Sequence, residues 1–313
     1  MSNAPAGRPL AIEAIGLTKS FGDFVAVDGL DLSVEAGELF SLLGPNGAGK
    51  TTTIRMLCCL LRPTAGTATV MGHDVVHDSI GVKRVIAVSP QETAIAEHLS
   101  ARENLDLMAG LHGIDRTEAE QRSADLLDMM ALSERAGEQA RRYSGGMKRR
   151  LSIAMALVSS PQVLFLDEPT IGLDPQSRRG VWDHIAGLKG DTTVVLTTHY
   201  LEEADALADR IAVVDTGKIV ALGSPTELKR TLGATQVTVV EATNLGDEAV
   251  SALRQLYPNV RLTDNGLEIE ADDATLYAID DCLRPFGVTI ESTYKKQVTL
   301  DDVFIDLTGK QLR

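Results

Sequence analysis

The chain has 313 residues, enough for one large or two ordinary domains, and 44% of them are hydrophobic. Its formal net charge of −14 argues against a protein that wraps nucleic acid, because such proteins usually carry a basic face. Residues 1–7 lack the apolar region of a signal peptide, and no apolar run approaches the ~20 residues that a membrane span requires. We therefore expect a soluble, cytoplasmic chain that serves a membrane only through a partner.

The beginning of the chain predicts short strands followed by a helix. Alternating and apolar runs predict strands at 10–17, 24–27, 30–34 and 38–43. A turn is expected at Asp28-Gly29, between the second and third of these strands. The first helix is expected to begin near Thr52 and to stop near Pro63.

Between the fourth strand and this helix lies the sequence GPNGAGKT, residues 44–51. It matches the complete phosphate-binding loop pattern in the strand-to-helix context that the pattern requires. Its glycines allow backbone N–H groups to point at one centre, and the helix N-terminus adds partial positive charge there. We expect Lys50 to reach the β- and γ-phosphates of a nucleotide and the Thr51 hydroxyl to hold Mg²⁺.

A helical region separates two strand-rich parts of the chain. The pattern turns helical from Ser100 to about Ala140, and Ser100 with Glu103 predicts a capping box. A further helix is expected at 146–158, with Ser144 as its N-cap. The remaining elements expected in the first domain are strands at 67–70, 85–88, 163–166 and 194–198, a helix at 202–209 and a hairpin at 211–221.

Two carboxylates follow the apolar strand 163–166, which is typical of a buried parallel sheet. We expect this strand to lie beside the strand of the phosphate loop, so that Asp167 can hold Mg²⁺. Glu168, one residue later, is placed to polarise an attacking water. The alternative is an ordinary solvated acidic pair, which the apolar strand and the upstream phosphate loop disfavour.

A second, smaller domain is predicted after a boundary near residues 225–235. The expected elements are a strand at 236–242, a helix at 247–256, strands at 259–263 and 267–271, a helix at 273–285, a strand at 288–295 and a helix at 299–308. Asn265-Gly266 predicts a hairpin turn, and the order βαββαβ predicts a small split-βαβ domain. The pairs Asp272-Asp273 and Asp301-Asp302 are expected to cap helices.

With GPNGAGKT, YSGGM (143–147) and VLFLDEP (163–169) in this order, the chain resembles ATP-binding-cassette (ABC) ATPases. The rest of the motif set is present as Gln91 in VSPQET, Gly172-Leu173-Asp174, and His199 in LTTHYLEEAD. The resemblance implies an α/β P-loop NTPase of the ABC type, with a mixed sheet core, an antiparallel β subdomain and a helical subdomain. It places this ATP-binding domain at 8–225, with a helical insert at about 92–140, and leaves 226–313 as a small α+β accessory domain.

The resemblance also implies a role for each matching residue. ATP would contact Phe21, Asn46, Gly47, Ala48, Gly49, Lys50, Thr51, Thr52, Ser144, Gly145, Gly146 and Asp174. Mg²⁺ would be held or contacted by Thr51, Gln91 and Asp167. The catalytic residues would be Glu168 as base, His199 contacting the γ-phosphate and orienting that base, Gln91 sensing the partner, and Lys50. Phe21 would stack on the base of ATP; from the residues alone, an ordinary core phenylalanine is an equal alternative.

The same resemblance implies a dimer. Ser144, Gly145 and Gly146 would complete the site of a second subunit, and Asp174 would lie at the subunit junction. ATP would then stabilise a closed homodimer, and hydrolysis would release it to drive a separate multi-span membrane permease. The helical insert is the expected docking site for that permease, which would hold the chain at the inner face of the cell membrane.

Two departures from the common signature narrow the resemblance. Tyr143 and Met147 stand where the family usually has leucine and glutamine, and they look like the subgroup that serves drug- or polysaccharide-export permeases. The end of the chain, 298–309, is similar to daunorubicin-resistance-type ATPases.

The leading hypothesis is therefore the ATPase subunit of an exporter. The alternative is a non-transport ABC ATPase acting on ribosomes or DNA, although such proteins usually carry two cassettes or a long coiled-coil insertion. The basic run at 141–150 is expected to lie near a phosphate-binding helix start, and no nucleic-acid partner is expected.

Overall fold

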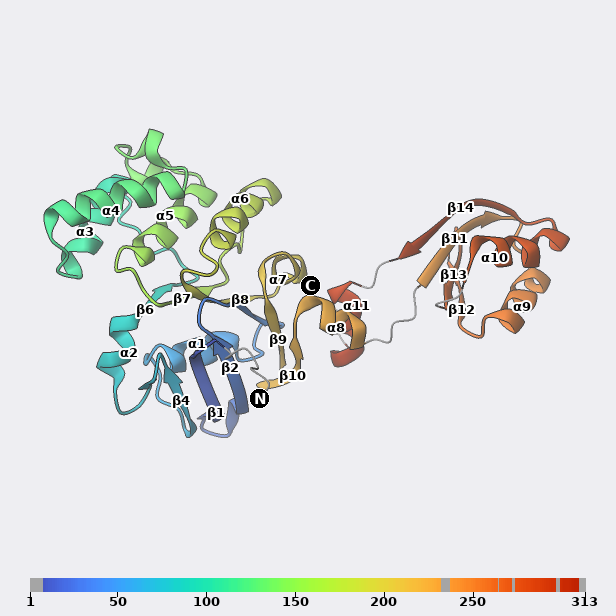
Figure 1. Ribbon diagram of the computed structural model, residues 1–313, viewed down its shortest axis with the longest axis horizontal. Helices are drawn as coiled ribbons and strands as arrows, with labels where there is room; N and C mark the ends of the chain where they lie inside the picture. Colours follow the sequence, from blue (N-terminus) through green and yellow to red (C-terminus); the bar gives the residue numbers. More distant parts are fainter. Residues whose placement is uncertain (1–7, 232–236, 264, 272–273, 297–298, 310–313) are drawn as a thin grey trace, which may run out of the picture. The chain divides into compact units, whose positions relative to one another are not determined.

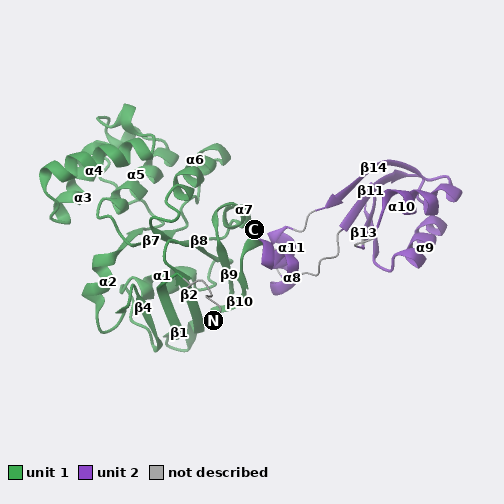
Figure 2. Ribbon diagram, in the orientation of Figure 1, with its two compact units in different colours: residues 1–225, 312–313 green, residues 226–311 purple. Residues whose placement is uncertain are grey.

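The computed structural model describes residues 8–231, 237–263, 265–271, 274–296 and 299–309. Contacts divide the chain into two compact units, which meet in sequence between Pro225 and Thr226 (Figure 2). The first unit contains two sheets, and Figure 1 shows its helices α3 to α6 on the side opposite to strands β1, β2 and β4. No helix in the described part of the chain combines the length and the apolar character needed to cross a bilayer.

The first sheet is antiparallel and has the order β2-β1-β4-β5. Its strands are β1 (Leu10–Phe21), β2 (Phe24–Glu35), β4 (Ala65–Val70) and β5 (His73–Asp74). The predicted break at Asp28-Gly29 is wrong, because β2 continues through it. Gly29 adopts a left-handed φ of 62°, its N–H donates to Thr18 Oγ1 over 3.0 Å, and the pairing with β1 shifts register nearby. A glycine bulge thus bends one long strand where the sequence suggests two.

The second sheet is mixed and has the order β10-β9-β3-β8-β7-β6. Its strands are β3 (Leu39–Leu43), β6 (Ile86–Ser89), β7 (Val163–Asp167), β8 (Thr193–Thr198), β9 (Arg210–Asp215) and β10 (Lys218–Gly223). All neighbouring pairs are parallel except β9 with β10. The strand that ends at Asp167 is not adjacent to the phosphate-loop strand, contrary to expectation, because β8 lies between them. The carboxyl ends of β3, β6, β7 and β8 nevertheless share one edge of the sheet, where open α/β folds bind ligands.

The helices of the first unit are α1 (Lys50–Leu57), α2 (Ser79–Val85), α3 (Ala101–Leu111), α4 (Arg116–Met129), α5 (Gly145–Leu157), α6 (Pro175–Ala186) and α7 (Leu201–Leu207). Helix α1 ends well before Pro63, since Cys59 adopts a left-handed φ of 55° and the N–H of Leu60 bonds back to Arg55 O. The capping box of α3 is confirmed: Ser100 Oγ accepts from Glu103 N–H, and the Glu103 carboxylate accepts from Ser100 N–H.

The second unit contains α8 (Pro225–Thr231), β11 (Val237–Thr243), α9 (Asp247–Leu256), β12 (Val260–Thr263), β13 (Gly266–Glu270), α10 (Leu276–Leu283), β14 (Thr289–Lys296) and α11 (Leu300–Thr308). Its sheet has the order β12-β13-β11-β14, and every pair is antiparallel. The core between this sheet and helices α9 and α10 includes Val240, Leu253, Leu267, Ile269, Ile279 and Leu283. Asp302 caps α11 together with Thr299, as expected, whereas Asp272-Asp273 lies outside the described residues.

Candidate nucleotide-binding and catalytic site

The phosphate loop occupies residues 44–49, between β3 and α1. Gly47 and Gly49 adopt φ values of 83° and 101°, which side chains other than glycine rarely allow. A Cβ atom at Gly49 would lie only 2.4 Å from Ala26 O, so this position also needs glycine for space. The loop backbone therefore leads directly into the N-terminus of α1, whose partial positive charge stabilises an anionic group.

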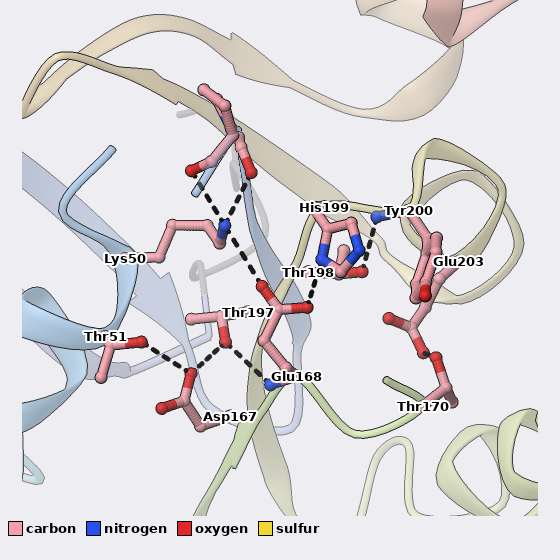
Figure 3. Close-up of polar contacts among 12 residues, drawn as sticks. Lys50, Thr51, Asp167, Glu168, Thr170, Thr197, Thr198, His199, Tyr200 and Glu203 are labelled. Atoms are coloured by element: carbon pink, nitrogen blue, oxygen red, sulfur yellow. Dashed lines mark hydrogen bonds and ion pairs between the residues drawn. The ribbon is translucent and has the colours of Figure 1, made fainter. Parts of the chain in front are cut away.

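Lys50 is the first residue of α1, and its side chain turns back under the loop. Its Nζ donates to Gly44 O over 2.6 Å and to Pro45 O over 3.2 Å, and it lies 3.2 Å from Glu168 Oε1 (Figure 3). Only 5% of the lysine is exposed. The ammonium group is thus fixed between the loop backbone and a carboxylate that follows β7.

A cavity of about 250 Å³ opens above the loop. Its lining consists of Phe21, Phe24, Ala26, Pro45, Asn46, Gly47, Ala48, Gly49, Lys50, Thr51, Thr52, Gln91 and Glu168. Phe21 is 50% exposed at this cavity, and Lys19 Nζ lies 5.1 Å from its ring centre. The alternative of an ordinary core phenylalanine is therefore wrong. An exposed ring beside a phosphate loop has the geometry of a stacking platform for a base.

Thr51 of α1 and Asp167 at the end of β7 meet across the site although β3, which precedes the phosphate loop, is not adjacent to β7. Asp167 Oδ1 accepts from Thr51 Oγ1 over 3.1 Å and from Thr197 Oγ1 over 2.6 Å (Figure 3). A hydroxyl and a carboxylate are hard oxygen donors, which Mg²⁺ prefers. Within the described residues there is no cluster of three or more His, Cys, Asp and Glu suited to a metal. The oxygens of Thr51 and Asp167 therefore fit a Mg²⁺ ion and would hold it.

Glu168 lies between Lys50 and His199. Its Oε2 is 2.7 Å from His199 Nδ1, while Oε1 faces the lysine (Figure 3). Its backbone has a left-handed φ of 48°, and its N–H donates to both O and Oγ1 of Thr197. A non-glycine residue in this region is strained, and such strain persists only where the surroundings fix it.

Gln91 and Glu168 line a second cavity as well as the first. This second cavity measures about 420 Å³ and is also lined by Glu92, Thr93, Gly145, Lys148, Arg149, Ile171, Gly172 and Leu173. The two residues therefore stand between the phosphate loop and the start of α5.

The signature residues begin α5. Ser144 is its N-cap, as predicted, and accepts from Met147 N–H over 3.3 Å. A Cβ atom at Gly146 would lie 2.9 Å from Ser177 Cβ, so glycine here allows α6 to approach. Asp174 caps α6 by accepting from the N–H groups of Gln176 and Ser177, and its bonds to Ser177 and Gln176 lower the pKa of its carboxyl. Of these described residues, Ser144, Gly145, Gly146 and Asp174 are absent from the lining of the phosphate-loop cavity of the same chain.

Sequence reasoning missed three residues that shape the site. Thr197 supports both Asp167 and Glu168, Arg149 bonds the carbonyl of Asp167, and Glu203 is completely buried next to the loop that follows Glu168. A partial signal existed for Glu203, because it lies only four residues after His199 in the sequence, on the buried face of α7. Arg149 gave no such signal, because it belongs to the basic run at 141–150, and runs of charged residues usually lie on the surface.

Known proteins are similar to this chain in sequence. A profile of the family described as ABC transporter matches residues 27–171. The chain is 45% identical over 309 residues to the daunorubicin resistance ATP-binding protein DrrA3 of Streptomyces coeruleorubidus, covering 97% of each chain. It is 34% identical to the linearmycin resistance ATP-binding protein LnrL of Bacillus subtilis, covering 96% of this chain and 99% of that one. It is 36% identical to the Nod factor export ATP-binding protein I of Ralstonia nicotianae, covering 95% and 94%.

Solved structures agree with these sequence relatives. An ATP-binding subunit of an ABC transporter superposes with a TM-score of 0.64 at 28% identity, covering 71% of this chain and 93% of that one. A dimeric ATP-binding cassette in a post-hydrolysis state, bound to ADP and Pi, superposes with a TM-score of 0.61 at 25% identity, covering 68% and 98%. The expected fold class and the resemblance to daunorubicin-resistance-type ATPases are confirmed. The chain belongs to the ABC transporter family, and within it to the ATP-binding proteins that hydrolyse ATP.

Proposed function

We propose that this chain is the ATPase subunit of an exporter whose membrane permease is a separate protein. One observation carries the proposal: the identity to drug-resistance and Nod factor export proteins extends over nearly the whole chain, including the second unit. The exported compound would be a drug, an antibiotic or a polysaccharide- or lipid-type molecule, and the permease would select it. The protein would act in the cytoplasm at the inner face of the cell membrane.

Nucleotide binding would use the cavity at the phosphate loop. The base of ATP would stack on Phe21, and its phosphates would accept hydrogen bonds from the backbone of 46–52. Thr51, Asp167 and Gln91 would hold Mg²⁺, which when bound neutralises charge on the β- and γ-phosphates. The exposed ring, the positive φ values of Gly47 and Gly49, and the oxygen pair of Thr51 and Asp167 support these roles.

Hydrolysis would begin with an exchange of partners at Lys50. A γ-phosphate bound to Nζ competes with Glu168 Oε1, which is 3.2 Å away. Release of this oxygen frees it to accept a proton from the attacking water. His199, which is 2.7 Å from Oε2, would keep the carboxylate oriented and contact the γ-phosphate. Gln91 would help to place the water, because it shares both cavities with Glu168.

The site would be completed by a second copy of the chain. Ser144, Gly145 and Gly146 start a 13-residue helix, so their end of α5 carries partial positive charge. Facing the γ-phosphate of a partner, this helix start would make ATP the bridge of a homodimer, with Asp174 at the junction. The dimeric form of a similar cassette supports this arrangement.

The experiment is affinity purification of the tagged Glu168→Gln variant from detergent-solubilised membranes of the native host, with ATP present. Co-purification of a multi-span membrane protein is expected. Recovery of ribosomes or DNA alone would overturn the transport proposal in favour of the non-transport alternative. Light scattering of the same variant should show ATP-dependent dimers, and a monomer at saturating ATP would refute the homodimer.

A further inference from the structure

The strained backbone of Glu168 is held on its N-terminal side by a buried arginine. Arg149 of α5 donates from Nη2 to Asp167 O over 3.0 Å and from Nη1 to Pro90 O over 2.6 Å. Only 4% of Arg149 is exposed. One guanidinium therefore ties the residue before Glu168 to the segment that carries Gln91.

A buried carboxylate holds the C-terminal side of the same residue. Glu203 Oε1 accepts from Thr170 Oγ1 over 2.7 Å (Figure 3) and from Trp182 Nε1 over 2.9 Å. Glu203 and Thr170 are both completely buried. This carboxylate therefore connects the loop after Glu168 with α6, which begins just after Asp174, and with α7, which follows His199.

Burying an ionisable group such as Arg149 or Glu203 costs free energy, so each needs a compensating role at its position. Burial lowers the pKa of Arg149 to about 10, and the carboxylates of Glu203, Asp167 and Glu168 oppose that change. Burial also raises the pKa of Glu203. Each group makes a hydrogen bond to the chain within two residues of Glu168.

We propose that Arg149 and Glu203 are positioning residues for ATP hydrolysis, which fix the left-handed backbone of Glu168 from both sides. The proposal rests on the proposed role of Glu168 as the base. Neither residue touches the reacting atoms; Arg149 acts through Asp167 O, and Glu203 acts through Thr170. Together they keep the base in register with α5, which Ser144 caps, and with α7, which follows His199.

Matched variants of the full-length chain test the proposal. Thr170→Val removes one donor to Glu203 Oε1 without changing the shape of the side chain, and Trp182→Phe removes the other donor together with part of the indole ring. Only the first breaks the link to the Glu168 loop. Arg149→Met removes the two hydrogen bonds from the guanidinium to Asp167 O and Pro90 O, which together with the Glu203–Thr170 bond form the clamp on Glu168. Arg150→Met is its control, because Arg150 on the same helix donates to Met130 O instead. The measurements are kcat and KM for MgATP, the melting temperature, and amide hydrogen exchange over residues 165–174 without nucleotide.

We expect Thr170→Val and Arg149→Met to lower kcat on the order of tenfold to a hundredfold, with KM within about twofold, since small misplacement of a base has that effect. Exchange should quicken at Glu168 and Ile171 in these variants, while both controls keep wild-type kcat and exchange. If Arg149→Met fails to fold, Arg149→Lys takes its place and should lower kcat partly, because one ammonium group bridges the two carbonyls poorly.

Equal kcat in Thr170→Val and Trp182→Phe, or losses confined to melting temperature, would overturn the proposal and leave a purely structural role. Failure of the base assignment gives a different pattern. Retained turnover in Glu168→Gln would remove the catalytic part, whereas the exchange difference between Thr170→Val and Trp182→Phe would still support or refute the clamp itself.

Discussion

Glu168 and Lys50 form a buried ion pair, with 3.2 Å between Oε1 and Nζ and no more than 6% of either side chain exposed. The pair joins the two halves of the site, because the lysine begins α1 and the carboxylate follows β7. A phosphate bound to the lysine would therefore change the surroundings of the proposed base. In the proposed mechanism, this one side-chain contact connects nucleotide binding with activation of Glu168.

Glu168→Gln should abolish steady-state hydrolysis and preserve ATP binding. An amide cannot accept the proton of water, and a general base contributes roughly a hundredfold to ten-thousandfold to a rate. Phosphate release measures the loss, and gel filtration with ATP should reveal dimers that persist. Glu202→Gln is the control, because Glu202 is the exposed neighbour of Glu203 on α7. Unchanged turnover in Glu168→Gln would sink the assignment of the base.

Lys50→Ala should weaken nucleotide affinity. A hydrogen bond to a charged group contributes about 1.5–3 kcal/mol, so the dissociation constant for a fluorescent ATP analogue should rise roughly tenfold to a hundredfold. The variant also leaves Glu168 without its cation, and its melting temperature should fall. Lys189→Ala, which removes a partly exposed partner of Asp209, serves as control. Undiminished binding by Lys50→Ala would contradict the proposed role of the loop.

The sequence predicts this site well where its parts are local. The phosphate loop lies between an apolar strand and a helix, and the carboxylates follow another apolar strand, so each pattern contains its own structural context. The order of the strands in the sheet cannot be predicted in this way, because it is decided by crossover connections between distant parts of the chain. No local pattern indicates that β8 lies between β3 and β7. For the same reason, the sequence does not predict the contacts of Arg149 and Glu203. Arg149 donates to Asp167 O, 18 residues later in the chain, and Glu203 accepts from Thr170, 33 residues earlier.

Ser144 allows a separation of capping from catalysis. As N-cap of α5 it should stabilise the helix by about 1 kcal/mol, and Ser144→Ala should lose that amount. Aspartate is an equally good N-cap, so Ser144→Asp should keep the melting temperature. Its negative charge would repel a γ-phosphate, and ATP-dependent dimers should disappear. If Ser144→Asp dimerises at the same ATP concentrations as the wild-type protein, Ser144 serves only as a cap.

The buried carboxyl of Glu203 should make stability depend on pH. Burial raises its pKa, so the folded protein holds this proton more tightly than the unfolded chain does. Stability is therefore lost as pH rises from the ordinary glutamate pKa of about 4.3 through the raised pKa, at about 1.4 kcal/mol for each pH unit between the two. Glu203→Gln does not titrate. Its melting temperature relative to wild type should increase with pH over this window and then level off, whereas the Glu202→Gln control should show no such trend. A difference that falls with pH would mean that the folded protein stabilises the charged carboxylate, with Arg149 outweighing the cost of burial, and a constant difference would mean that folding leaves the pKa of Glu203 unchanged.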